Sequence, residues 1–69
     1  KIENGTVIGP KAIVSTNTYI GAGSIISAGA IIDHDVILET CVHIDVGAIV
    51  KAGRKVKEET KLKAGEVLF

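Results

Sequence analysis

An aliphatic residue recurs at every sixth position from one end of the chain to the other. Twelve successive positions of this series hold only isoleucine, leucine or valine: Ile2, Ile8, Val14, Ile20, Ile26, Ile32, Leu38, Ile44, Val50, Val56, Leu62 and Leu68. These residue types make up 22 of the 69 residues, so chance would give the series with odds on the order of one in a million. A period of six excludes an α-helix, whose apolar period is 3.6. Each unit of six is therefore expected to contain a short strand and a tight turn.

The remaining positions of the six-residue unit follow the same period. With the aliphatic residue as position one, position five holds small or β-branched residues until Arg54 and Glu66 interrupt the pattern near the end of the chain. Position four holds six of the eight glycines, together with Asn17 and Asp35, and these residue types tolerate a positive φ. They are predicted to mark corners. Cys41 also falls at position four, and we interpret it as a small corner residue rather than a nucleophile.

Three units of six residues would close one triangular coil, so the chain is predicted to form about 3.8 coils of 18 residues each. We expect a single all-β domain over residues 1–69, a parallel β-helix whose position-one side chains stack inside a prism. Strands of successive coils would satisfy each other's backbone hydrogen bonds. The charged last coil, with Arg54 and Glu66 at core positions, is expected to form a polar cap.

An unbroken aliphatic column is predicted on one outer side of this prism. The residue before each position one should point outward, and a step of 18 residues places one group of four on the same side: Ile13, Ile31, Ile49 and Val67. Such a ridge marks a binding surface, although small domains also leave single apolar side chains exposed. A chain of 69 residues with one cysteine has neither a large core nor an internal disulfide. We therefore expect a homotrimer that packs through this ridge.

The only two histidines, His34 and His43, lie nine residues apart, which is half a coil. They are expected on different sides of one prism, so that only neighbouring chains of a trimer would bring them together. His34 is flanked by Asp33 and Asp35, and a carboxylate beside an imidazole fixes its tautomer and raises its basicity. An imidazole with a pKa near 6.5 suits a general base at neutral pH. The spacing alone leaves two interpretations open, a catalytic base or a polar corner.

Two motifs carry a resemblance to a known family. The triplet Asp33-His34-Asp35 is followed nine residues later by His43, which begins the run His-Ile-Asp-Val-Gly-Ala ending at Ala48. This pattern resembles the hexapeptide-repeat acyltransferases, and within them the sialic-acid O-acetyltransferase and UDP-4-amino-sugar N-acetyltransferase family of bacterial glycan biosynthesis. The resemblance implies a trimeric acetyltransferase. It also implies a left-handed β-helix, against the usual crossover rule.

The resemblance implies specific roles around the first histidine. His34 would act as general base and remove a proton from an amino or hydroxyl group of a sugar or nucleotide sugar, which attacks the thioester of acetyl-CoA. Asp35 would orient and polarise His34. Backbone N–H groups at Ala52 and Gly53, one coil further along, would stabilise the thioester oxyanion.

The resemblance also places the co-substrate, acetyl-CoA, in the groove between neighbouring prisms. His43 of a neighbouring subunit would line the site near the acetyl group. Lys51, Arg54 or Lys55 would meet the phosphates of the co-substrate. No metal site is implied.

The chain departs from the family in two respects. Members usually carry a β-α-β domain that binds the nucleotide sugar ahead of the β-helix, and no Gly-rich phosphate turn between a strand and a helix is found here. Either the chain is the C-terminal part of a longer protein, which we expect, or the acceptor is held differently. Members also commonly have a pair of glycines near the oxyanion position, and the first of the pair is Ala52 here.

Other functions fit the sequence less well. A net charge of zero gives no reason to expect nucleic acid as a partner, and no apolar run approaches the roughly 20 residues of a membrane helix. A single cysteine suits the cytoplasm. Two histidines are too few for the three-histidine zinc site of the β-helical carbonic anhydrases. A non-catalytic β-helical scaffold, or an inactive fragment of such an enzyme, stays an alternative.

Overall fold

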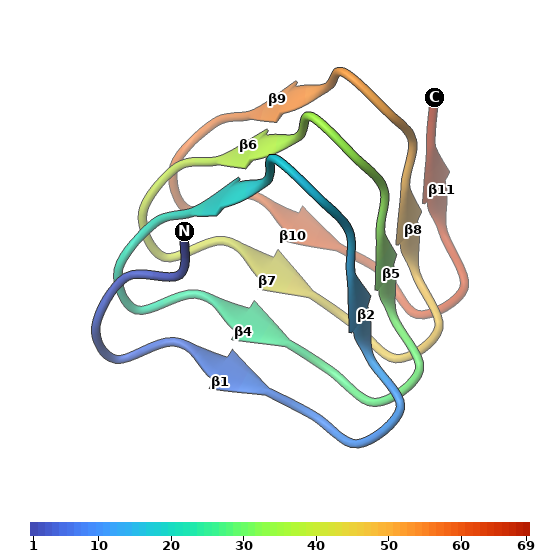
Figure 1. The fold of residues 1–69 in the computed structure, drawn as a ribbon. Helices are drawn as coiled ribbons and strands as arrows, with labels where there is room; N and C mark the ends of the chain where they lie inside the picture. The colour runs from blue at the N-terminus through green and yellow to red at the C-terminus, as the bar shows by residue number, and fades with distance from the viewer.

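Position six of one unit and position one of the next form a short strand of two residues. A turn at positions three and four follows each strand. The computed structural model describes all of residues 1–69 (Figure 1). Its eleven strands are β1 Val7–Ile8, β2 Ile13–Val14, β3 Tyr19–Ile20, β4 Ile25–Ile26, β5 Ile31–Ile32, β6 Ile37–Leu38, β7 His43–Ile44, β8 Ile49–Val50, β9 Lys55–Val56, β10 Lys61–Leu62 and β11 Val67–Leu68. It contains no helix that is long and apolar enough to cross a membrane.

The strands form three parallel sheets, one on each side of a triangular prism (Figure 1). One side consists of β1, β4, β7 and β10, the next of β2, β5, β8 and β11, and the third of β3, β6 and β9. Every paired residue lies 18 positions from its partner, as in Val7 with Ile25, and a bridge between Ile2 and Ile20 extends the third side. The all-β parallel coil predicted from the six-residue period is confirmed. Its left-handed sense stays a prediction from the resemblance.

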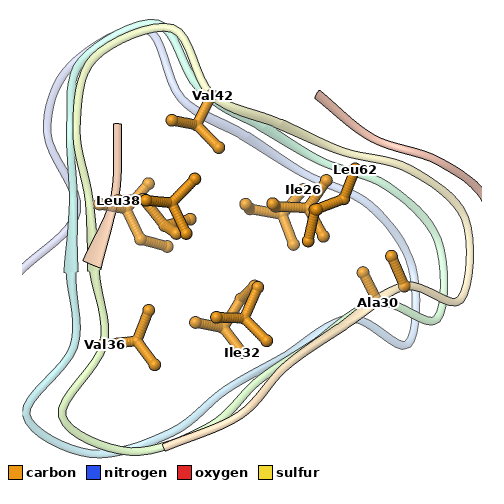
Figure 2. Close-up of a cluster of buried hydrophobic side chains, with 12 residues drawn as sticks. Ile26, Ala30, Ile32, Val36, Leu38, Val42 and Leu62 are labelled. Carbon is orange, nitrogen blue, oxygen red and sulfur yellow. The ribbon is translucent and has the colours of Figure 1, made fainter. Parts of the chain in front are cut away.

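The aliphatic series forms the core, as predicted. Figure 2 shows these side chains stacked in ladders inside the prism, with Ala30, Val36 and Val42 at position five filling the corners. Twelve hydrophobic residues are buried: Ile20, Ile26, Ala30, Ile32, Val36, Leu38, Val42, Ile44, Ala48, Val50, Val56 and Leu62. The first two members of the series, Ile2 and Ile8, are exposed because no coil lies beneath them.

The corners have a common backbone conformation. A positive φ occurs at position four of every unit: Gly5, Lys11, Asn17, Gly23, Gly29, Asp35, Cys41, Gly47, Gly53, Glu59 and Gly65. The corner role that we assigned to Cys41 is therefore confirmed. Gly21, at position two, answers a different constraint, since a Cβ there would lie 2.6 Å from the backbone carbon of Glu39 in the next coil. This glycine allows the close approach of two coils.

The last coil is formed in spite of its charge. Strands β9, β10 and β11 pair with the coil beneath them, and Val56 and Leu62 are almost fully buried. Arg54 and Glu66 stand at position five but are exposed, so they do not belong to the core. The coil thus ends the hydrophobic ladder with charged side chains on its outside, which agrees with the predicted polar cap.

Candidate functional site

Most of the predicted site residues lie along one edge of the prism. Three corners stack there, at residues 15–18, 33–36 and 51–54, and they link the side that contains β5 to the side that contains β6. We refer to this stack as the His34 edge. Its corners are joined by backbone hydrogen bonds, from the Asp35 N–H to the Thr16 carbonyl at 3.1 Å and from the Gly53 N–H to the His34 carbonyl at 3.1 Å. The period of 18 residues therefore sets the neighbours of His34.

The side chain of His34 is held by Asp35. Its Nδ1 lies 2.8 Å from the Asp35 Oδ2 atom. Because a carboxylate only accepts, Nδ1 carries the proton of this bond, and Nε2, which has no partner in the chain, keeps its lone pair when the ring is neutral. Asp33 instead accepts the His34 backbone N–H at 2.8 Å. The expectation that Asp35 rather than Asp33 orients the imidazole agrees with this geometry.

The two side chains shift each other's proton affinity. The hydrogen bond that His34 donates to Asp35 raises the pKa of His34 above its ordinary value of 6.5, with a further contribution from the negative charge of Asp33. Desolvation opposes this shift. The pKa of Asp35 is lowered, first by the hydrogen bond from His34 and then by one from Asn17. Both side chains are about half exposed, at 55% and 54%, so the imidazole is accessible to a substrate.

Asn17 is a site residue that the sequence analysis did not identify. Its Nδ2 donates to the Asp35 Oδ1 atom at 3.0 Å, and the two residues are separated by one coil of 18 positions. Both are corner residues with nearly equal positive φ, 60° for Asn17 and 56° for Asp35. The signal was present in the sequence, because Asn17 and Asp35 are successive members of one position-four column.

The backbone groups predicted for an oxyanion differ in availability. The Gly53 N–H is already donated to the His34 carbonyl, so it is not free to bind a ligand. The Ala52 N–H makes no hydrogen bond within the chain. Of the two N–H groups predicted as donors, only that of Ala52, in the corner directly next to that of His34, is therefore available.

The predicted cations lie on the same edge. Lys51, Arg54 and Lys55 are all exposed, in or directly after the corner that stacks on the His34 corner. The Lys55 Nζ atom lies 3.3 Å from the Glu39 Oε2 atom, whereas Lys51 and Arg54 make no ion pair. Two unpaired cations therefore stand one coil from His34.

His43 lies away from this edge, as expected for one chain. It belongs to β7, on the side of the prism opposite the His34 edge. Its Nε2 is 3.4 Å from the Ser27 hydroxyl oxygen, a neighbour that the sequence analysis did not consider. A serine at position two, directly after β4, could have indicated this contact, because β4 pairs with β7. The two histidines are not brought together within a single chain.

The edge itself forms no pocket. A single chain has no pocket, and no group of three or more His, Cys, Asp or Glu side chains is placed to hold a metal ion. The His34 edge is a convex corner of the prism. A small molecule could be enclosed there only by a second surface laid against it.

Comparison with known proteins gives one match. A family model described as "Bacterial transferase hexapeptide (six repeats)" matches residues 1–34. No curated protein matches the chain, and no solved structure does either. The match and the coil together support a hexapeptide-repeat fold of the bacterial transferase type. The matched segment ends at His34, so Asp35, the cations and His43 lie beyond it.

Proposed function

We propose that the chain is an acetyl-CoA-dependent acetyltransferase that acetylates an amino or hydroxyl group of a sugar or nucleotide sugar. The observation that carries the proposal is the exposed His34 imidazole, whose Nδ1 is 2.8 Å from the Asp35 carboxylate and whose Nε2 is free. This is the arrangement of a general base in which one ring nitrogen is fixed and the other accepts a proton. The hexapeptide match, to a transferase family, supports the same reaction class.

The proposed reaction moves one proton and exchanges one bond. His34 Nε2 takes the proton from the acceptor nitrogen or oxygen as that atom bonds to the acyl carbon. The carbon–sulfur bond of the thioester breaks, and the proton passes from His34 to the departing thiolate. The Ala52 N–H, which has no partner in the chain, is the donor that we assign to the developing oxyanion.

Acetyl-CoA is assigned to the same edge by charge. Lys51 and Arg54 are exposed and unpaired there, and their positive charges suit the phosphates of the co-substrate. Lys55 would join them by exchanging its ion pair with Glu39 for a phosphate. We propose that the wall opposite the His34 edge is a neighbouring subunit of a homotrimer, which contributes His43 to the site.

Titration calorimetry with acetyl-CoA tests the donor site. We expect saturable binding at one molecule per chain. Replacing Lys51 or Arg54 by alanine is expected to weaken binding about tenfold or more, because each loses a charge-assisted contact worth roughly 1.5–3 kcal/mol. Lys63→Ala is the matched control for Lys51→Ala. Lys63 is also exposed and, like Lys51, stands at position two of its unit, but it lies at another edge. The control variant should bind as the unchanged chain does.

The base is tested separately by release of free thiol from acetyl-CoA in the presence of a panel of amino sugars and their nucleotide derivatives. His34→Gln should abolish acceptor-dependent release and leave the affinity for acetyl-CoA unchanged. A folded chain that binds no acetyl-CoA would refute the proposal and favour the non-catalytic scaffold. Equal weakening by Lys63→Ala would contradict the assignment of the donor site to the His34 edge.

A further inference from the structure

The backbone of the His34 corner is fixed on both sides by its neighbouring coils. The Asp35 N–H donates to the Thr16 carbonyl, the Gly53 N–H donates to the His34 carbonyl, and the His34 N–H donates to the Asp33 side chain. These bonds set the backbone but not the rotamer of the Asp35 carboxylate, which is half exposed. An exposed carboxylate needs a second contact to keep one orientation, since side-chain rotamer freedom otherwise disperses it.

That second contact comes from one residue. The Asn17 amide donates to Oδ1 of Asp35 at 3.0 Å, while Oδ2 accepts from His34 at 2.8 Å. On the far side the next member of the column is Gly53, which has no side chain to offer. The two carboxylate oxygens of Asp35 are thus divided between Asn17 and His34.

We infer that Asn17 is a positioning residue that fixes the Asp35 carboxylate and so holds the neutral His34 ring in its Nδ1–H tautomer with Nε2 free. It acts through Asp35 and does not contact a substrate itself. The catalytic meaning of this relay rests on the proposed function. The relay itself, Asn17 to Asp35 to His34, is a property of the free chain.

The equal backbone conformations of the two corner residues explain why the contact forms. Both Asn17 and Asp35 have a left-handed backbone, so their side chains leave the corner in the same direction, one coil apart. Asparagine and aspartate are the non-glycine residues that adopt this conformation most readily. The amide of Asn17 and the carboxylate of Asp35 make a donor–acceptor pair, whereas two carboxylates would repel each other.

The test is ¹⁵N NMR of the histidine rings of the full chain, recorded at a pH above the His34 midpoint. Asn17→Gly removes the amide and keeps the positive φ without strain. We expect its His34 to move from mainly Nδ1–H towards the Nε2–H form, in the direction of an Asp35→Gly reference that lacks the carboxylate. Cys41→Gly is the matched control, a neutral corner residue with φ of 56° at another edge, and its His34 should be unchanged.

An Asn17→Gly chain with the tautomer of the unchanged protein, beside a shifted Asp35→Gly reference, would overturn the inference. Asn17→Asp is the second variant, which tolerates the same φ and replaces the donor by an acceptor, and it should shift the tautomer in the same direction. The measurement uses neither acetyl-CoA nor an acceptor. A failure to bind acetyl-CoA would therefore refute the proposed function and leave the tautomer result standing.

Discussion

A left-handed backbone at every corner decides what a side chain at position four can reach. Five corner residues other than glycine adopt it, and each accepts some strain to do so. At Asn17 and Asp35 the strained conformation has a use, because it stacks an amide on a carboxylate and the carboxylate on His34. At Lys11 no hydrogen bond or ion pair of the side chain accompanies the same conformation.

The His34–Asp35 pair predicts how the chain responds to pH. The pKa of His34 is raised, so acceptor-dependent thiol release should increase with pH through a midpoint above 6.5 and then level off as the base becomes neutral. Asp35→Asn, which tolerates the positive φ, should move this midpoint to lower pH. The pH profile of thiol release and an NMR titration of the His34 ring protons, each recorded for both proteins, check the two statements. A midpoint that Asp35→Asn leaves in place would contradict the assigned partner.

The same pair affects stability with a defined sign. The raised pKa of His34 gives a contribution that is complete below pH 6.5, its ordinary value, and is lost as the pH rises through its folded value. The lowered pKa of Asp35 gives a second contribution to stability. It is present above pH 3.8, the ordinary pKa of an aspartate, and is lost as the pH falls through the pKa of Asp35 in the folded chain. The window in which both contributions are present therefore lies between these two ordinary values. Both groups are exposed, so the effect is small beside that of the core.

Strands of two residues gain their stability from stacking rather than from their own length. Each strand turns one residue outward and one inward, and the inward residue is buried in the middle of the stack but not on β1 in the first coil. Ile26 on β4 is fully buried, whereas Ile8 on β1, at the same position of the unit and on the same side, is 38% exposed. The contribution of an aliphatic residue thus depends on its coil, although the sequence pattern is identical.

This difference gives a prediction for the core ladder. Ile26→Ala should lower the free energy of unfolding by about 2–5 kcal/mol, because it leaves a cavity between two fixed coils. Ile8→Ala should cost less than about 1 kcal/mol, since much of its side chain already contacts water. Denaturant unfolding at one protein concentration measures both. Equal losses would contradict the view that the first coil is an open end of the ladder.

At the scale of the whole molecule, apolar surface remains on every side of the prism. The ridge Ile13, Ile31, Ile49 and Val67 is the one outer column that is aliphatic on every strand of its side, in register from β2 to β11. The column through Val7 and Ile25 and the column through Tyr19 and Ile37 both end in charged or titratable residues on later strands. Two members of the ridge, Ile31 and Ile49, lie at its centre and are half buried by their own chain.

The ridge predicts the oligomeric state. Ile31→Lys should dissociate the proposed trimer into monomers, because an interface would bury an unpaired charge at a cost of several kcal/mol. Ile37→Lys is the control, an outward isoleucine of β6 with 44% exposure on a different side. Light scattering gives the mass of each variant. A trimer that survives Ile31→Lys would show that the ridge is not the interface.

Periodicity alone determined the coil, its three sides and its core. A strict period of six without insertions brings the position-one aliphatic residues together inside one prism, so the ladders, the corners and even Cys41 followed from counting. The same counting placed Lys51, Ala52, Gly53, Arg54 and Lys55 beside His34, because residues 18 apart become neighbours. The same counting also placed His43 on the side of the prism opposite the His34 edge.

Only the tertiary structure decided which polar atoms are used and which are free. The period gives the neighbour of a residue but not the direction of its side chain or the partner of its N–H group. The period therefore gave no choice between Asp33 and Asp35, which only the family resemblance supplied, and it did not identify Asn17. The Gly53 N–H was treated as available, although it donates to the His34 carbonyl. Hydrogen bonds depend on rotamers and on angles over a few tenths of an ångström, and a repeating sequence does not encode these in its spacing.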